Sequence, residues 1–171
     1  ELCRQIVLNK PQKLILLDVS EAQLYEIHQE LSETLQETTN PLSVEALIGN
    51  VQNGMLMSHI LRKHRVQTIY HAAAYKHVPM VENNVIAGVT NNVFGTYEIA
   101  QAAIYCKVET FVLISTDKAV NPTSVMGATK RAAEIYVQSL NNLLSEIEAD
   151  SPTRFITTRF GNVLGSNGSV I

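Results

Sequence analysis

Apolar residues recur along this chain at two spacings that alternate. Short apolar runs ending at polar residues are typical of buried strands, whereas longer segments with an apolar residue every three or four positions are typical of amphipathic helices. No hairpin signal joins two strands, so the pattern predicts an α/β fold, a doubly wound parallel sheet with helices on both faces. The predicted strands are residues 13–17, 43–49, 68–74, 110–114 and 153–159, and the predicted helices are residues 1–9, 21–37, 54–64, 84–106 and 124–148.

A cluster of reactive side chains directly follows the predicted strand at 110–114. In open α/β sheets, ligands bind at the carboxyl ends of the strands. We therefore predict that this cluster is the centre of a ligand-binding or catalytic site. Its members are two hydroxyls, one carboxylate and one amine: Ser115, Thr116, Asp117 and Lys118.

A second amine, Lys130, lies on the predicted helix that begins near residue 124. It falls one turn after Met126, on a helix face that is otherwise apolar. A lysine on such a face either snorkels to solvent or is held inside for a purpose. The spacing favours the second alternative, so we predict that Lys130 belongs to the same site.

The ends of other predicted strands carry candidate cofactor-binding residues. Asp18 ends the first strand, where a carboxylate either accepts hydrogen bonds from a dinucleotide ribose or is a helix-capping or turn residue. Asn50 follows the second strand and either reaches an adenine ring or caps a helix. Ala72, Ala73 and Ala74 either let a cofactor approach the backbone closely or reflect tight packing.

Five further polar residues are candidates with an equally open alternative. Lys76 and His77 either contact the cofactor or substrate or form a solvated basic loop. Asn92 lies in the apolar stripe of a helix, and is either a satisfied core amide or a residue that orients a lysine or a water under the cofactor. Arg159 and Asn162, at the end of the last strand, either bind a phosphate or sugar or only fix the loop.

Composition excludes several classes of function. The net charge of −3 gives no electrostatic case for nucleic-acid binding. Two cysteines without CxxC spacing favour a cytosolic protein with reduced thiols, and we predict no metal site. No apolar run is long enough for a membrane span, and no signal peptide is visible. We therefore predict a cytoplasmic location, although an upstream region of a larger protein is compatible with membrane anchoring.

Five blocks of the sequence resemble a known family, the polysaccharide-biosynthesis group of extended short-chain dehydrogenases. These relatives are UDP-N-acetylglucosamine 4,6-dehydratases of bacterial capsule, O-antigen and flagellin-glycan pathways. The resemblance covers nearly the whole chain and implies a Rossmann-like fold. The string STDKAVNPT, with GATK after it, is the most specific part. The blocks begin at His71, Thr90, Ser115, Met126 and Arg159.

The resemblance implies a mechanism. A bound nicotinamide takes hydride from the sugar C4, water is lost across C5 and C6, and hydride returns to C6. Lys118 would be the C5 base, which requires a lowered pKa, and Asp117 the C6 acid. Thr116 or Ser115 would hydrogen-bond the C4 oxygen, and Lys130 would hold the nicotinamide ribose.

Two departures from the family pattern matter. Short-chain dehydrogenases usually carry a catalytic tyrosine where this chain has Met126, and a thioether cannot transfer a proton. A branch of the family has methionine there, which leaves Lys130, Asp117 or a water as acceptors of the C4 proton. The glycine-rich phosphate loop belongs before Glu1, where the chain begins without Met and inside a helical pattern. We therefore expect residues 1–171 to be a partial NAD(P)-binding domain that lacks its first strand, glycine loop and most of the sugar-binding lobe.

The cofactor, partners and competing functions follow from the same resemblance. Asp18 favours NAD over NADP, because a carboxylate repels a 2′-phosphate. Helices 84–106 and 124–148 pair across a dimer in relatives, so we expect a homo-oligomer that binds a UDP-sugar. A UDP-sugar 4-epimerase or reductase would predict tyrosine at position 126. A non-catalytic truncated remnant is the third alternative.

Overall fold

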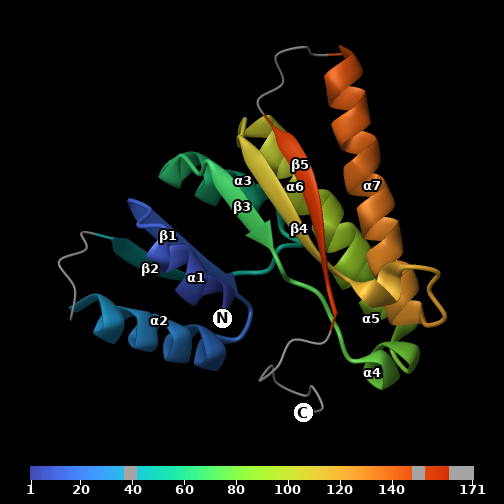
Figure 1. Cartoon of the computed structure of the whole chain (residues 1–171), viewed down its shortest axis with the longest axis horizontal. Helices are drawn as coiled ribbons and strands as arrows, with labels where there is room; N and C mark the ends of the chain where they lie inside the picture. The colour runs from blue at the N-terminus through green and yellow to red at the C-terminus, as the bar shows by residue number, and fades with distance from the viewer. Residues whose placement is uncertain (37–41, 148–152, 162–171) are drawn as a thin grey trace. The chain divides into compact units, whose positions relative to one another are not determined.

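The computed structural model describes residues 1–36, 42–147 and 153–161 (Figure 1). Its contacts divide the chain into two units, Glu1–Asn50 and residues 51–171. Each unit contains its own parallel sheet, so the α/β class predicted from the alternating pattern is confirmed.

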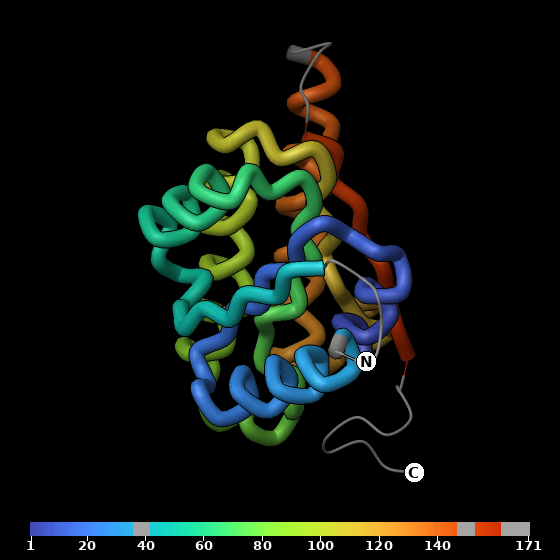
Figure 2. The backbone as a smooth tube through the Cα atoms, turned by 90° about the vertical axis from the view of Figure 1, so that its left-hand side faces the viewer, coloured from blue at the N-terminus to red at the C-terminus, as the bar shows by residue number. Residues whose placement is uncertain are grey.

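The first unit is a two-stranded parallel sheet with two helices. Lys13 pairs with Ser43, and the pairing continues in register along both strands. A small core of Val7 and four leucines holds the helices against the strands; Figure 2 shows the backbone of this unit at the blue end of the scale. Its elements are α1 (Leu2–Leu8), β1 (Lys13–Asp18), α2 (Glu21–Gln36) and β2 (Ser43–Ile48).

The second unit contains a three-stranded parallel sheet in the order β3-β4-β5. The central strand is the most apolar, and the ring of Phe111 lies 5.8 Å from that of His71 and 5.2 Å from that of Phe155. Ser115 and Arg159 are directly opposite each other at the carboxyl end of the sheet. The strands are β3 (Thr68–His71), β4 (Thr110–Thr116) and β5 (Arg154–Phe160).

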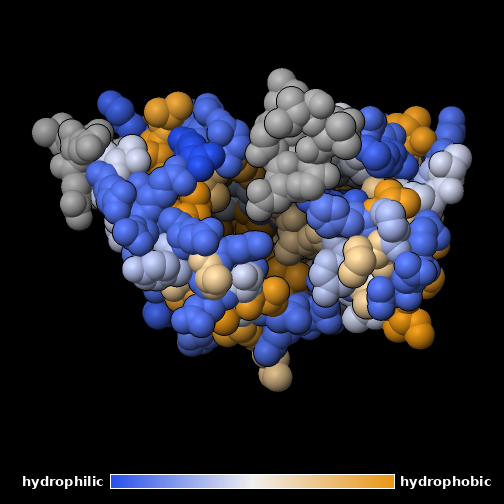
Figure 3. Space-filling view, turned by 90° about the horizontal axis from the view of Figure 1, so that it is seen from below, coloured by the Kyte–Doolittle hydropathy of each residue, from blue (hydrophilic) through white to orange (hydrophobic). Residues whose placement is uncertain are grey.

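Helices on the second unit's sheet carry most of its buried side chains. The long helix α7 packs on β4 and β5, and α3 packs on α6 (Figure 1). The helices are α3 (Gly54–His64), α4 (Val78–Glu82), α5 (Val85–Val89), α6 (Gly95–Tyr105) and α7 (Val125–Ile147). On the face that Figure 3 shows, hydrophilic residues predominate and hydrophobic ones form smaller groups between them.

The structure differs from the sequence prediction in three places. The strand predicted at 68–74 ends at His71, because it pairs with β4 only that far. The helix predicted at 84–106 is interrupted by a π-helical turn at Thr90–Phe94. The short helix α4 precedes it, with Pro79 in its first turn, where a proline costs no hydrogen bond.

The π-helical turn places Asn92 where its side chain is 1% exposed. Its amide nitrogen donates to the Tyr75 carbonyl at 3.1 Å and to the Thr129 hydroxyl at 3.0 Å. Its amide oxygen accepts from the Tyr75 N–H at 2.7 Å and from the Asn91 side chain at 3.2 Å. All four hydrogen-bonding positions of the amide are therefore used. This residue fastens the loop after β3 to α7.

We predict that Asn92→Ala destabilises the protein by about 2–3 kcal/mol, because it leaves the buried Thr129 hydroxyl and the backbone groups of Tyr75 without their partner. Asn84→Ala is the matched control, since that exposed side chain makes one hydrogen bond, to the Met80 carbonyl. The control should change the free energy of unfolding by less than about 0.5 kcal/mol in urea titrations. Equal effects of the two substitutions would contradict this role for Asn92.

Candidate active site

The acid, amine and hydroxyl at the end of β4 form one hydrogen-bonded group. Ser115 and Thr116 are the last residues of the strand, and Asp117–Ala119 form a 3₁₀ turn after it. Thr116 Oγ1 donates to Asp117 Oδ1 at 2.9 Å, and Lys118 Nζ lies 3.4 Å from the same oxygen. The hydrogen bond from Thr116 is the main reason that the pKa of Asp117 lies below its ordinary value, and the Lys118 charge adds to it. Both charged side chains are about half exposed, as groups that meet a ligand must be.

Lys130 is buried behind this group. It is 8% exposed and Met126 is 2% exposed, which confirms that both lie on the inner face of α7. Lys130 Nζ donates to the Ile114 carbonyl at 2.9 Å, so the amine reaches the carboxyl end of β4. Burial lowers the pKa of Lys130 to about 8, although the charge of Glu134 acts in the opposite direction.

Gly127 allows the first turn of α7 to approach the turn that carries Lys118. A Cβ atom at this position would lie 2.4 Å from the Lys118 carbonyl oxygen and 3.1 Å from Cβ of Pro122. Any side chain at position 127 would force the backbone of Lys118 to move, so only glycine fits here. The glycine therefore fixes the place of the Lys118 backbone relative to α7.

Arg159 and Asn162 were predicted to contact a phosphate or a sugar. The structure places Arg159 in a two-pronged contact with Glu134, with Nε 2.8 Å and Nη2 2.7 Å from the two carboxylate oxygens. This matches the alternative that Arg159 fixes the end of β5. Asn162 lies outside the described residues. Gly161 follows β5, and a Cβ there would lie 3.8 Å from Asp117 Oδ2, so this segment runs beside the Asp117 carboxylate.

The loop after β3 is open to solvent. Ala72, Ala73, Lys76 and His77 are exposed, and Ala74 is half-buried. Small exposed side chains at the carboxyl end of a strand leave room for a cofactor against the backbone. The predicted contacts of Lys76 and His77 with cofactor or substrate stay predictions.

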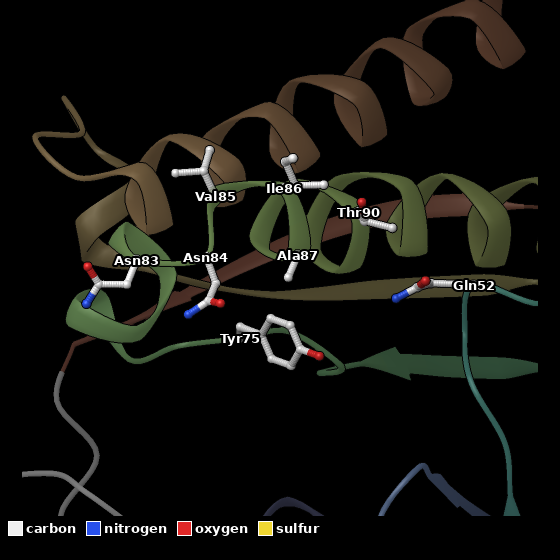
Figure 4. Close-up of a pocket in the computed structure, with 8 residues that line it drawn as sticks. All are labelled: Gln52, Tyr75, Asn83, Asn84, Val85, Ile86, Ala87 and Thr90. Atoms are coloured by element: carbon white, nitrogen blue, oxygen red, sulfur yellow. The ribbon is translucent and has the colours of Figure 1, made fainter.

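Beside this loop lies a groove of about 750 Å³ on the second unit. Figure 4 shows the Tyr75 ring beneath α5, with Asn83 and Asn84 toward one end and Gln52 at the other. The lining contains three side-chain amides and the ring of Tyr75. Its other members are Val85, Ile86, Ala87 and Thr90. The pattern of apolar residues did not predict this groove, because its lining combines segments that lie far apart in the sequence.

Asp18 and Asn50 belong to the first unit. Asp18 ends β1, and its Oδ1 accepts a hydrogen bond from the Ser20 N–H at 2.8 Å. The turn alternative for this carboxylate is therefore observed, while the Ser20 hydroxyl accepts from the Gln23 N–H at 3.4 Å in the first turn of α2. A contact of Asp18 with a ribose stays a prediction. Asn50 follows β2 and is exposed, and its proposed contact with adenine also stays a prediction.

Sequence reasoning missed three buried or capping groups near the site. His71 is 4% exposed, and its Nε2 lies 2.9 Å from Thr96 Oγ1. Burial, and then the charge of Lys130, lowers the pKa of His71 to about 3, so the imidazole is neutral. Glu82 accepts a hydrogen bond from the Val125 N–H at 2.7 Å and caps α7. Glu134 pairs with Arg159. None of these pairs is close in sequence, so no local pattern marks them.

Within the parts of the chain that the structure describes, no three His, Cys, Asp or Glu side chains gather in a way that would hold a metal ion. In the same residues, no helix is both long and apolar enough to cross a membrane.

We predict that Lys130→Met stabilises the protein near neutral pH by up to about 3 kcal/mol. The pKa of Lys130 is about 8 in the folded protein and 10.5 for an ordinary lysine, and this difference is a measure of the free-energy cost of burying the charged amine. That cost is fully present below about pH 8 and disappears as the pH rises toward the pKa of the unfolded chain. The gain should therefore shrink in urea titrations above pH 8. Lys63→Met, at an exposed position, is the control; a pH-independent gain at position 130 would contradict the assignment.

The comparisons with known proteins decide the family. The model of the family described as polysaccharide biosynthesis protein matches residues 1–171. The chain belongs to this family. The resemblance expected from the sequence blocks is thereby confirmed.

Curated relatives include two kinds of nucleotide-sugar enzyme. The chain is 48% identical over 171 residues to the capsular polysaccharide biosynthesis protein CapD of Staphylococcus aureus, covering 100% of the chain and 27% of the relative. It is 34% identical over 162 residues to a UDP-N-acetylglucosamine 4,6-dehydratase (inverting) of Campylobacter jejuni, covering 95% and 44%. It is 32% identical over 157 residues to a UDP-glucose 4-epimerase of Rickettsia rickettsii, covering 92% and 44%. The chain thus spans between about a quarter and a half of these relatives.

Solved structures support the fold. Pen from Bacillus thuringiensis is 32% identical with a TM-score of 0.85, covering 98% of this chain and 48% of that one. DesIV, a dTDP-glucose 4,6-dehydratase from Streptomyces venezuelae with NAD and TYD bound, has a TM-score of 0.72 at 20% identity, covering 92% and 50%. The chain therefore has the Rossmann fold of the extended short-chain dehydrogenases.

Proposed function

We propose that the full-length protein is a UDP-N-acetylglucosamine 4,6-dehydratase, which makes a UDP-4-keto-6-deoxy sugar for bacterial surface polysaccharide. The observation that carries this proposal is the hydrogen-bonded group of Thr116, Asp117 and Lys118 at the end of β4, with Lys130 buried behind it. An acid and an amine held together are what removal of water across a carbon–carbon bond requires.

The residues of this site fit a nicotinamide cofactor. The exposed alanines after β3 leave space against the backbone, and the buried amine of Lys130 is suited to hold a ribose hydroxyl. Ser115, buried beside it, belongs to the same wall of the site. A nicotinamide bound here would take hydride from C4 of the sugar and return it at C6. We favour NAD over NADP, because Asp18 would repel a 2′-phosphate.

Proton transfers are assigned to the residues at the end of β4. Asp117 accepts the proton of the C4 hydroxyl, directly or through the Thr116 hydroxyl that already donates to it. Lys118 removes the proton from C5. Asp117 then returns its proton to the departing C6 hydroxyl, which leaves as water, and Lys118, whose half-exposed amine exchanges its protons with solvent, delivers a proton to C5. The net change is the loss of one water, and no proton transfer through the Met126 thioether is needed.

The epimerase alternative explains these residues less well. An epimerase moves hydride only to and from C4, and so needs neither a C5 base nor a C6 acid. The Asp117–Lys118 pair would have no task in it, and position 126 would carry a proton-transferring tyrosine. A non-catalytic remnant does not account for a lysine kept buried at a cost in stability.

The decisive experiment incubates the full-length protein with UDP-N-acetylglucosamine and NAD, or NADP in parallel, and measures the product by mass spectrometry. We predict a product lighter by one water. Lys118→Ala should slow its formation by about a hundredfold or more while bound nicotinamide is retained, because general-base contributions are of that size. Lys63→Ala, an exposed lysine on α3, should behave as the wild type.

Three outcomes would contradict the proposal. An isomerised sugar of unchanged mass would support the epimerase. Unchanged sugar with no bound nicotinamide would support the remnant. Full water loss by Lys118→Ala would remove this lysine from the mechanism.

We also propose that two copies pair through the helices at 84–106 and 124–148. Large apolar side chains are exposed on these segments, and a helix face of this kind commonly forms an interface. They are Phe94, Tyr97, Ile135 and Leu143.

We predict that Leu143→Asp lowers the molar mass of the full-length protein in light scattering to that of a smaller assembly, because a charge at an interface is costly. Met55→Asp is the control, since Met55 is 86% exposed but lies on α3. A monomeric wild type, or equal effects of both substitutions, would contradict this pairing.

A further inference from the structure

Helix α7 carries two buried charges one turn apart. Lys130 is 8% exposed and Glu134 is 2% exposed. Ionisable groups are rarely buried this deeply unless they are paired or functional. The mechanism proposed above uses Lys130 and leaves Glu134 without a task.

Glu134 connects α7 to the last strand. Both carboxylate oxygens accept from the Arg159 guanidinium, at 2.8 and 2.7 Å, and Arg131 adds a 3.0 Å hydrogen bond from its own helix. A two-pronged arginine–carboxylate contact fixes orientation as well as distance. Arg159 is opposite Ser115 in the sheet register. The contact thus fastens the end of β5, which pairs with the end of β4, to helix α7.

The residue that follows the end of β5 lies close to the Asp117 carboxylate. Gly161 comes two residues after Arg159, and a Cβ there would lie 3.8 Å from Asp117 Oδ2. A shift of β5 along β4 would therefore change what faces the Asp117 carboxylate.

Glu134 lies one helical turn after Lys130 on α7, and both side chains are buried, so the carboxylate charge acts on the amine with little screening by water. Burial alone would raise the pKa of Glu134, but the hydrogen bonds from Arg159, together with that from Arg131, lower it to about 2. The group is therefore a carboxylate at working pH. Its charge opposes the effect of burial on the Lys130 amine.

We propose that Glu134 is a positioning residue for the reaction: through Arg159 it fixes the end of β5 beside Asp117, and through its charge it keeps the Lys130 amine protonated. The positioning of β5 beside Asp117 rests on the proposed function. The charge role concerns groups of this chain alone. Among the described residues, charged or titratable groups that face this pair include His71 on β3, whose pKa the Lys130 charge lowers, and Arg131 and Arg159, which donate to Glu134.

The first test measures the protonation of Lys130 in the full-length protein. Lysines are labelled with a trace amine-acylating reagent at a series of pH values, and the Lys130 peptide is quantified by mass spectrometry. Glu134→Gln should lower the labelling midpoint by about one pH unit or more, because it removes a negative charge and leaves Arg159 uncompensated. Glu134→Asp should keep the midpoint near that of the wild type. An unchanged midpoint in Glu134→Gln would overturn the charge role, whether or not the protein is a dehydratase.

The second test measures the rate of water loss. Glu134→Gln and Arg159→Lys should both lower kcat about tenfold or more with little change in KM. In Glu134→Gln the charge is lost, and in Arg159→Lys the charge is kept but the two-pronged contact cannot form. Glu134→Asp, which keeps the charge, should also lower kcat. Arg131→Gln removes a partly exposed contact to the same carboxylate and should stay within about fivefold of the wild type.

The outcomes separate the two proposals. A wild-type protein that never loses water from the sugar rejects the proposed function, and the labelling experiment still decides the charge role. A fully active Arg159→Lys overturns the positioning role. Equal losses in Arg131→Gln and Arg159→Lys would also overturn it, since they would reflect charge near Glu134 and not the fixed end of β5.

Discussion

The arrangement of the candidate active site depends on one buried hydrogen bond, from the Lys130 amine to the Ile114 carbonyl at 2.9 Å. A charged amine is costly to bury, and it stays buried only where its surroundings compensate for the lost water. The carbonyl lies near the end of β4, directly before the turn that carries Asp117 and Lys118. The same contact therefore ties the helix to the strand end where the reactive side chains lie.

Other features of the second unit hold the two ends of that hydrogen bond in place. Gly127 lets the first turn of α7 lie against the Lys118 backbone. Asn92, placed by a π-helical turn, fastens the loop after β3 to Thr129 on α7. Glu82 caps the first turn of the same helix. Contributions from four chain segments thus converge on one helix end, which is how a functional site is kept rigid.

The fold and the inward direction of Lys130 could be predicted from the sequence because they depend on local spacing. The strand and helix pattern repeats within a few residues, and Met126 and Lys130 share a face by helical geometry alone. The partner of Arg159 could not be predicted, because Glu134 lies on a different element, 25 residues away. An exposed arginine can form an ion pair or bind a ligand, and the sequence alone does not distinguish the two. The π-helical turn likewise leaves no mark in the pattern of apolar residues, and its role is visible only through the contacts of Asn92. At Asp18 the sequence supported a ribose contact or a capping or turn role, and the structure shows the turn.

The central claim is that Lys118 exchanges the C5 proton while hydride moves from C4 to C6. The most direct measurement runs the reaction of the full-length protein with UDP-N-acetylglucosamine in heavy water and locates deuterium in the product by NMR. The account predicts a product that has lost one water and carries one solvent deuterium, at C5, with none at C6. Deuterium at C6, or a product without any deuterium at C5, would contradict it.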